Sequence, residues 1–159
     1  MKTLVVYYSR TGHTRTAGEA LAKELACDAE EIVDTANRSG PLGWVLSGKQ
    51  ASGKALTRLQ PLKKDLSQYD LVIVGTPVWA GTISTPVRTF LVENKDRLKK
   101  VAFFVTMGGR GDAPTLQGME EACGKRPEAT LALKTGDIKK GAYAEELKEF
   151  AGKMRSTLS

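Results

Sequence analysis

The sequence contains few of the residues on which metal centres and disulfide frameworks depend. Its 159 residues include two cysteines and one histidine. Cys27 and Cys123 lie far apart and outside any CxxC motif, and His13 has no second or third ligand at a suitable spacing. We therefore expect two buried thiols, no disulfide and no metal site.

Long apolar runs are also missing. No run approaches the ~20 residues of a membrane-spanning helix, and residues 1–8 lead into a predicted strand without the features of a signal peptide. The composition, 41% hydrophobic and 26% charged, is that of an ordinary folded protein. We expect a cytoplasmic protein with no membrane span and a single domain over residues 1–159.

Acidic residues are scarce in one segment. The whole chain carries +6, and within residues 34–64 six basic residues face only Asp34, which gives +5. Such a segment could meet nucleic acid, but without interleaved aromatic residues or a nucleic-acid motif we disfavour that partner. The six basic residues are Arg38, Lys49, Lys54, Arg58, Lys63 and Lys64.

Short apolar runs alternate with helical patterns along the chain. Nearly continuous apolar runs are typical of parallel strands covered on both faces. We predict strands at Leu4–Tyr8, Leu71–Val74, Val101–Val105 and Thr130–Leu133, and the spacing implies a further strand at Glu31–Val33.

Helical patterns fill the intervals. Thr14–Leu25 and residues 143–154 have apolar stripes of helical period, Thr85-Pro86 is typical of a helix start, and Asp112 is a candidate cap for a fourth helix. We expect one or two more helices in residues 36–61. This alternation predicts an α/β fold, a doubly wound parallel sheet with helices on both faces, in which ligands bind at the carboxyl ends of the strands.

The loop after the first predicted strand is suited to phosphate. The residues Ser9-Arg10-Thr11-Gly12-His13-Thr14 offer three hydroxyls, a flexible glycine and no carboxylate before a helix begins. A helix N-terminus has unpaired N–H groups and the positive end of a dipole. An ordinary turn with a threonine N-cap is the alternative.

A second loop, "TPVWAG" at residues 76–81, follows the apolar run Leu71–Val74. This loop places Trp79 between Gly75 and Gly81, where its flat side chain could border a flat ring. The alternative is that Trp79 packs on the domain's own helices.

With these loops in view, the chain resembles the flavodoxin family of FMN-binding proteins. "SRTGHT" resembles the phosphate loop, "TPVWAG" the loop beside the isoalloxazine ring, and "TMGGRGD" at residues 106–112 stands at the other flavin-side loop. The resemblance implies a five-stranded sheet of order 2-1-3-4-5 and non-covalent FMN. It implies that the cofactor contacts Ser9, Arg10, Thr11, Gly12, His13, Thr14, Thr76, Pro77, Val78, Trp79, Ala80, Gly81, Met107, Gly108 and Gly109, with no catalytic side chain among them.

Two departures from the family indicate an enzyme. Flavodoxin electron carriers are usually strongly acidic, and their second flavin-side loop usually brings an aromatic residue to the ring, which Met107–Asp112 does not. We therefore expect an FMN-dependent oxidoreductase that passes electrons from NAD(P)H to a quinone-like or other small acceptor, with the basic segment over the flavin attracting an acidic nucleotide.

Two other functions stay open from the residues. One is an electron-transfer protein of the flavodoxin type that depends on a separate reductase as its redox partner. The other is a response-regulator receiver domain, but Ser9-Arg10 and Gly75-Thr76-Pro77 stand where that fold needs acidic residues.

Overall fold

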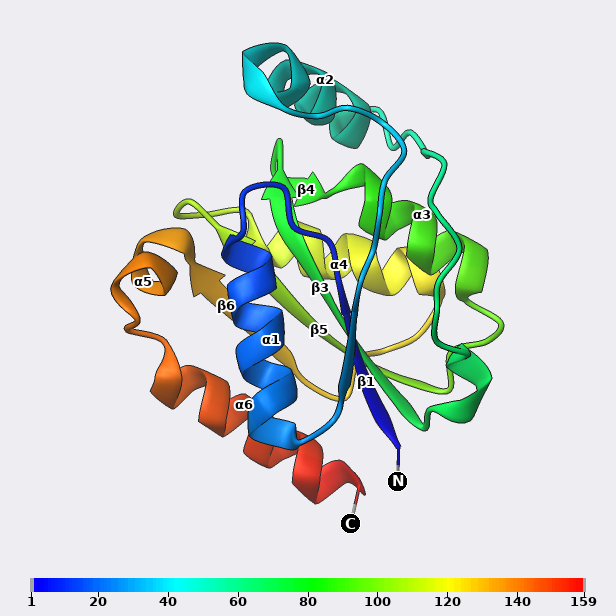
Figure 1. The fold of residues 1–159 in the computed structure, drawn as a ribbon, viewed down its shortest axis with the longest axis vertical. Coiled ribbons are helices and arrows are strands. Elements are labelled where there is room, and N and C mark those ends of the chain that lie inside the picture. The colour runs from blue at the N-terminus through cyan, green and yellow to red at the C-terminus, as the bar shows by residue number, and fades with distance from the viewer. Residues whose placement is uncertain (1, 159) are drawn as a thin grey trace.

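The computed structural model describes residues 2–158 and is built around a parallel sheet (Figure 1). Neighbouring strands follow the order β2-β1-β3-β5-β6, and β4 pairs in the antiparallel direction with the end of β3. The strands are β1 (Thr3–Tyr7), β2 (Asp28–Glu31), β3 (Leu71–Trp79), β4 (Thr82–Ile83), β5 (Lys100–Met107) and β6 (Thr130–Lys134).

The sheet therefore has six strands, and the predicted count of five is corrected. The added strand, β4, is only two residues long and pairs Val78 with Ile83 and Trp79 with Thr82. No apolar run marks it, because it is the return arm of a hairpin at the end of β3. The five parallel strands have the neighbours that the order 2-1-3-4-5 describes.

Helices cover both faces of this sheet, as Figure 1 shows. One face packs against α1 (His13–Leu25), α5 (Thr135–Lys140) and α6 (Ala144–Leu158), and the other against α3 (Thr85–Asn94) and α4 (Asp112–Cys123). Side chains that alternate along β1 enter the two cores in turn: Val5 and Tyr7 face α1, and Leu4 and Val6 face the opposite side. Burial on both faces explains the continuous apolar runs of the strands.

The remaining α-helix, α2 (Gly40–Ser52), lies outside these two layers. It lies beyond the carboxyl ends of the strands and contacts β3, β4 and α3 (Figure 1). It is the single α-helix of the segment 36–61, and a short 3-10 turn at Leu66–Gln68 follows before β3. None of the helices within residues 2–158 is long and apolar enough to cross a membrane.

The edge strand β2 differs from its prediction. The expected strand was Glu31–Val33, whereas β2 covers Asp28–Glu31 and pairs Leu4 with Asp28. Its residues are half-buried and include three acidic side chains, so no apolar run marks it. The spacing that implied the later strand does not locate its ends, and Ile32 continues the pairing beyond β2 by donating its N–H to the carbonyl of Tyr7 at 2.7 Å.

Candidate functional site

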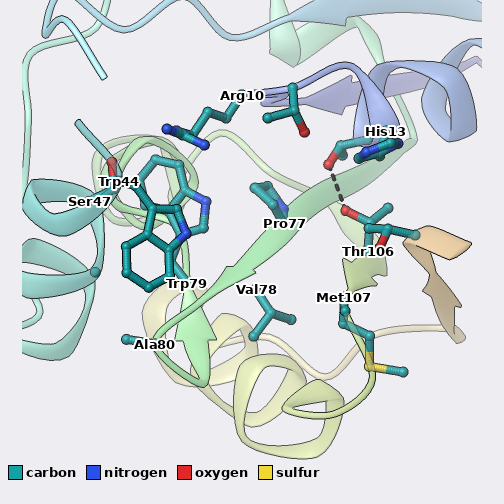
Figure 2. Close-up of a pocket in the computed structure, with 15 residues that line it drawn as sticks. Arg10, His13, Trp44, Ser47, Pro77, Val78, Trp79, Ala80, Thr106 and Met107 are labelled. Atoms are coloured by element: carbon teal, nitrogen blue, oxygen red, sulfur yellow. Dashed lines mark hydrogen bonds between the residues drawn. The ribbon is translucent and has the colours of Figure 1, made fainter. Parts of the chain in front are cut away.

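The carboxyl ends of β1, β3 and β5 open into a cavity of about 360 Å³ that α2 closes on one side (Figure 2). Its position agrees with the rule for doubly wound sheets. Ten of the fifteen residues predicted from the sequence line it: Arg10, Thr11, His13, Thr14, Pro77, Val78, Trp79, Ala80, Met107 and Gly108.

The loop between β1 and α1 presents backbone donors. Gly12 precedes the helix with φ 101°, a conformation that glycine adopts at little cost, and its N–H donates to Ser9 Oγ at 3.0 Å. The N–H of Thr16 donates to the carbonyl of Gly12 at 3.0 Å. The three N–H groups of residues 13–15 have no acceptor within residues 2–158, and the first turn contains no acidic residue. These features suit an anion.

Thr14 ties this loop to the neighbouring strand. It is buried, and its Oγ1 lies 2.8 Å from Oγ1 of Thr106 at the end of β5, as the dashed line in Figure 2 marks. The alternative of a threonine N-cap is wrong, since Gly12 occupies that position and Thr14 lies within the helix. Each hydroxyl has donor and acceptor capacity, so one can donate to its neighbour while the other donates into the cavity.

Arg10 connects the same loop to the start of α2. Its Nε donates to the carbonyl of Arg38 at 2.9 Å, and its Nη2 donates to the carbonyl of Gly40 at 3.0 Å. Two donor groups of this guanidinium are therefore used within the protein, and the remaining N–H groups are the ones available toward the cavity.

Trp79 belongs both to the cavity wall and to the core. It is 9% exposed and meets Tyr8 edge to face, with ring centroids 5.5 Å apart and planes at 88°. The Arg38 guanidinium carbon lies 5.2 Å from its ring centroid, within cation–π range. Burial is the main cause that raises the pKa of Tyr8 above its ordinary value, and the nearby Asp34 adds to it.

The α2 side of the cavity contains residues that the sequence prediction missed. Trp44, 68% exposed, lines the cavity together with Ser47 and Gly48 (Figure 2). The loop Met107–Asp112 contains no aromatic residue, as expected, but Trp44 brings one from a different segment. A tryptophan in a glycine-punctuated segment was the available signal, yet nothing local indicated that α2 turns toward the cavity.

A buried ion pair holds α2 in place. Arg38 pairs with Asp34, and both side chains are almost fully buried. Arg38 Nη1 also donates to Ser47 Oγ at 3.3 Å, and that hydroxyl donates to the carbonyl of Gly43 at 2.7 Å. The helix passes so close to Arg38 that a Cβ on Gly43 would lie 2.2 Å from its carbonyl oxygen. Position 43 therefore requires glycine.

Thr106 and Thr135 were also missed. Both follow from the expectation that ligands bind at strand carboxyl ends, because Thr106 precedes Met107 in β5 and Thr135 begins α5 directly after β6. The predicted contact residues follow three strands only, and none of them lies at the end of β6.

Five predicted residues do not line this cavity. Ser9 and Gly12 form the turn of the first loop, as described above. Thr76 is fully buried, with its hydroxyl 2.9 Å from Ser84 Oγ and accepting the N–H of Ser84 at 3.1 Å, so it holds the β4 hairpin. Gly81 and Gly109 line a shallow hollow of about 690 Å³ that shares Val78, Ala80 and Gly108 with the cavity.

The basic segment does not hang over the cavity in the way that was expected. None of its six basic residues lines the cavity, and Arg38 is buried against Asp34. The other five are exposed. The side of this segment that reaches the cavity is aromatic and neutral. The basic residue that lines the cavity is Arg10, from the loop after β1, and Arg110 lines the adjoining hollow.

The cysteines are both free, Cys27 half-buried and Cys123 buried. Burial is the main cause that raises the pKa of Cys27 to about 11, and burial also raises the pKa of Cys123. Both thiols are therefore protonated at neutral pH, and neither lies at the cavity.

Comparison with known proteins identifies the family. The family model described as Flavodoxin matches residues 2–154. The chain belongs to the flavodoxin family. The predicted family is thereby confirmed, and so is the predicted class of fold, an α/β sandwich with a doubly wound parallel sheet.

Solved structures of flavodoxin-like proteins superimpose over most of the chain. The flavoprotein of Lactobacillus acidophilus NCFM in complex with FMN is 25% identical, with 87% of this chain and 97% of that chain covered and a TM-score of 0.72. The apo form of the flavoprotein from the same organism is 27% identical, with 87% and 95% covered and a TM-score of 0.62. Oxidised Flavodoxin 2 of Bacillus cereus, 17% identical with 99% of each chain covered and a TM-score of 0.62, shares the fold.

Proposed function

We propose that this flavodoxin-family protein binds FMN in the cavity and passes electrons from NAD(P)H to a quinone-like or other small acceptor. The cofactor predicted from the sequence agrees with the family and with the flavoprotein of Lactobacillus acidophilus, whose crystal structure contains FMN. The observation that carries the proposal is the placement of an anion-binding helix N-terminus and two tryptophans around one cavity.

The residues present fit FMN. The free N–H groups at the start of α1, with Thr11 beside them, suit the terminal phosphate, since no carboxylate lies in that turn. Trp44, Trp79 and Pro77 provide apolar walls for a flat ring. A cavity of about 360 Å³ lies within the range of small-ligand sites, about 300–1,000 Å³. These residues would bind and orient the cofactor and exclude water from one side of it.

Bound FMN would supply the redox chemistry, both hydride acceptance and transfer of one or two electrons. Among residues 2–158 no carboxylate lines the cavity, and we assign His13, which does line it, to the phosphate end of the cofactor, so the chain's own contribution is position and electrostatics. The shallow hollow beside Gly108 supports direct use of NAD(P)H. It opens next to the ring side of the cavity, has glycine-rich walls that allow close approach, and contains the exposed cation of Arg110 for a nucleotide phosphate.

The electron-carrier function is the second candidate, and Trp44 favours it. An exposed aromatic residue at the cavity weakens the sequence argument that the flavin face is left uncovered. A carrier would accept electrons from a reductase and would not oxidise NAD(P)H by itself.

The test begins with the visible spectrum of the purified protein, which should show bound flavin that mass spectrometry identifies as FMN. The FMN-loaded protein is then mixed anaerobically with NADH or NADPH. Bleaching of the flavin band with either nucleotide, and its return on addition of a quinone, is the expected result. Protein that contains FMN but bleaches only after a separate reductase is added would establish the carrier function instead.

A further inference from the structure

The helix α2 has three distinct faces. Gly43, Ser47 and Ala51 are buried against the body of the protein, and Trp44 and Gly48 line the cavity. The third face points away from both, because positions 42, 45, 46 and 49 fall on one arc of a helix with 3.6 residues per turn. This arc is neither part of the fold's core nor part of the flavin site.

The outward arc is apolar and exposed. Leu42 is 86% exposed, Val45 58% and Leu46 39%, and we call these three residues the α2 ridge. Outside α2, the large exposed apolar residues within residues 2–158 stand singly, Val33 and Leu56 in loops and Val92 on α3. Single exposed apolar residues are normal, but three on one helical arc indicate a surface that binds something. In Figure 1, α2 projects from one end of the molecule.

Two lysines lie toward the C-terminal end of this ridge. Lys49 completes the same arc, and Lys54 follows two residues after the helix ends. Both are exposed, and neither takes part in an ion pair within residues 2–158. Residues 35–64 contain no acidic residue at all, and the chain as a whole carries +6. A surface that combines projecting leucine and valine side chains with unpaired lysines complements an anionic, apolar phase.

We propose that the α2 ridge docks this protein on the surface of an anionic lipid bilayer. Leu42, Val45 and Leu46 would enter the boundary between headgroups and acyl chains while Lys49 and Lys54 meet acidic headgroups. Because α2 also carries Trp44 on a neighbouring face, this docking would hold the cavity within one helix diameter, ~10 Å, of the membrane surface, near an apolar acceptor dissolved in the bilayer.

Two features favour a bilayer over another occupant. A second copy of this chain would bring two positively charged arcs together, which like-charge repulsion opposes. A protein partner that binds a helix usually offers a groove to an apolar stripe, and such a partner would need acidic residues around that groove. A fluid bilayer can accommodate a projecting helix without any such preformed groove.

Vesicle binding by the full chain tests the proposal, because it does not depend on the redox reaction. Purified protein is sedimented with vesicles of phosphatidylglycerol and phosphatidylcholine, and with vesicles of phosphatidylcholine alone. Binding should require the anionic lipid and weaken with added salt. The double variant Leu42→Ser/Leu46→Ser should lower the partition coefficient by about tenfold, because it removes most of the apolar area that would be buried.

Matched controls separate the ridge from general surface changes. Val33→Ser/Val92→Ser removes two exposed apolar residues outside α2 and should change partitioning by less than about twofold. Lys49→Glu/Lys54→Glu should lower it by at least about tenfold, whereas Lys99→Glu/Lys100→Glu, with the same change in net charge at the other end of β5, should have a much smaller effect. Thermal unfolding of each variant shows that it is folded.

Several results would overturn the proposal. Absence of binding to the anionic vesicles would do so directly. Equal loss of binding in the ridge variant and its apolar control would show that the ridge is not the docking surface. Light scattering that finds a wild-type dimer, converted to monomer by Leu42→Ser/Leu46→Ser, would assign the ridge to a second copy of the chain. In each of these cases the FMN proposal stands, since flavin content is measured separately.

Discussion

The two sides of the cavity are held by different kinds of interaction. On the α1 side, the loop 9–14 is fixed at both ends by buried elements, β1 before it and the core-facing α1 after it. On the α2 side, a helix outside the two main layers places one apolar side chain, Ala51, in the core. A buried ion pair, one hydroxyl and the close contact at Gly43 hold the rest of it. The polar side is thus supported by the hydrophobic core, and the apolar side mainly by a polar cluster.

This difference predicts where substitutions act. Changes on the α1 side should alter ligand affinity with little effect on folding. Changes beneath α2 should first loosen the helix and only then affect the ligand.

The largest effect is expected for Asp34→Ala. It leaves the Arg38 guanidinium buried without its partner, and removal of one member of a buried ion pair costs about 3–5 kcal/mol. The free energy of unfolding, measured with urea, should fall by that amount, and proteolysis should cut first within residues 36–56. The double variant Asp34→Leu/Arg38→Met removes both charges and should recover part of the loss. The remainder reflects the bonds that Asp34 accepts from Ala36 N–H and the Thr57 hydroxyl, which both variants lose. Equal destabilisation in the single and double variants would show that the ion pair does not hold α2.

Thr11→Asp should have the next largest effect, on affinity alone. It places a carboxylate at the helix N-terminus where the phosphate is proposed to bind, and we expect FMN to bind about 30–100-fold more weakly, or ~2–3 kcal/mol. Riboflavin, which has no phosphate, should bind wild type and variant equally, and Thr11→Ser should retain FMN. If the variant kept full FMN affinity, the assignment of the phosphate site to this loop would be wrong.

Trp79→Ala should reduce FMN affinity by about 1–3 kcal/mol. Part of the effect comes from lost core packing, because Trp79 also contacts Tyr8 and Arg38. Trp79→Phe keeps an aromatic ring at the site and should restore much of the affinity. Titration of apoprotein with FMN, followed by quenching of tryptophan fluorescence, measures both. Unchanged affinity in the alanine variant would assign Trp79 to the core alone.

Trp44→Ala should give the smallest effect, about 0.5–1 kcal/mol in FMN affinity and little change in stability. The side chain is 68% exposed, so it contributes little to folding, and its ring has freedom to move when no ligand restrains it. If Trp44 cost more affinity than Trp79, the α2 side would be the dominant wall of the site and the contrast drawn above would be reversed.

The two sides also differ in how far the sequence predicted them. The loop 9–14 was found because the strand, loop and helix that create it are consecutive, so local patterns contain the information. Trp44, Ser47 and Gly48 were missed because their position depends on Arg38 folding back onto Asp34 and on Gly43 passing the Arg38 backbone. The count of six basic residues in 34–64 did not reveal that one of them, Arg38, is paired with Asp34 inside the protein. The strand β4 was missed for a similar reason, since pairing of a two-residue segment is decided by the hairpin and not by its own composition.

Close packing between neighbouring strands has a consequence for how this family can diversify. A Cβ on Gly75 would lie 2.0 Å from the ring of Phe104 on β5. Neither position can change by itself: a larger residue at 75 requires a smaller one at 104, and a smaller residue at 104 alone leaves a void next to the glycine. We therefore expect the two positions to change together during evolution. Related chains should combine glycine at position 75 with a large aromatic residue at position 104, or a larger residue at 75 with a smaller one at 104.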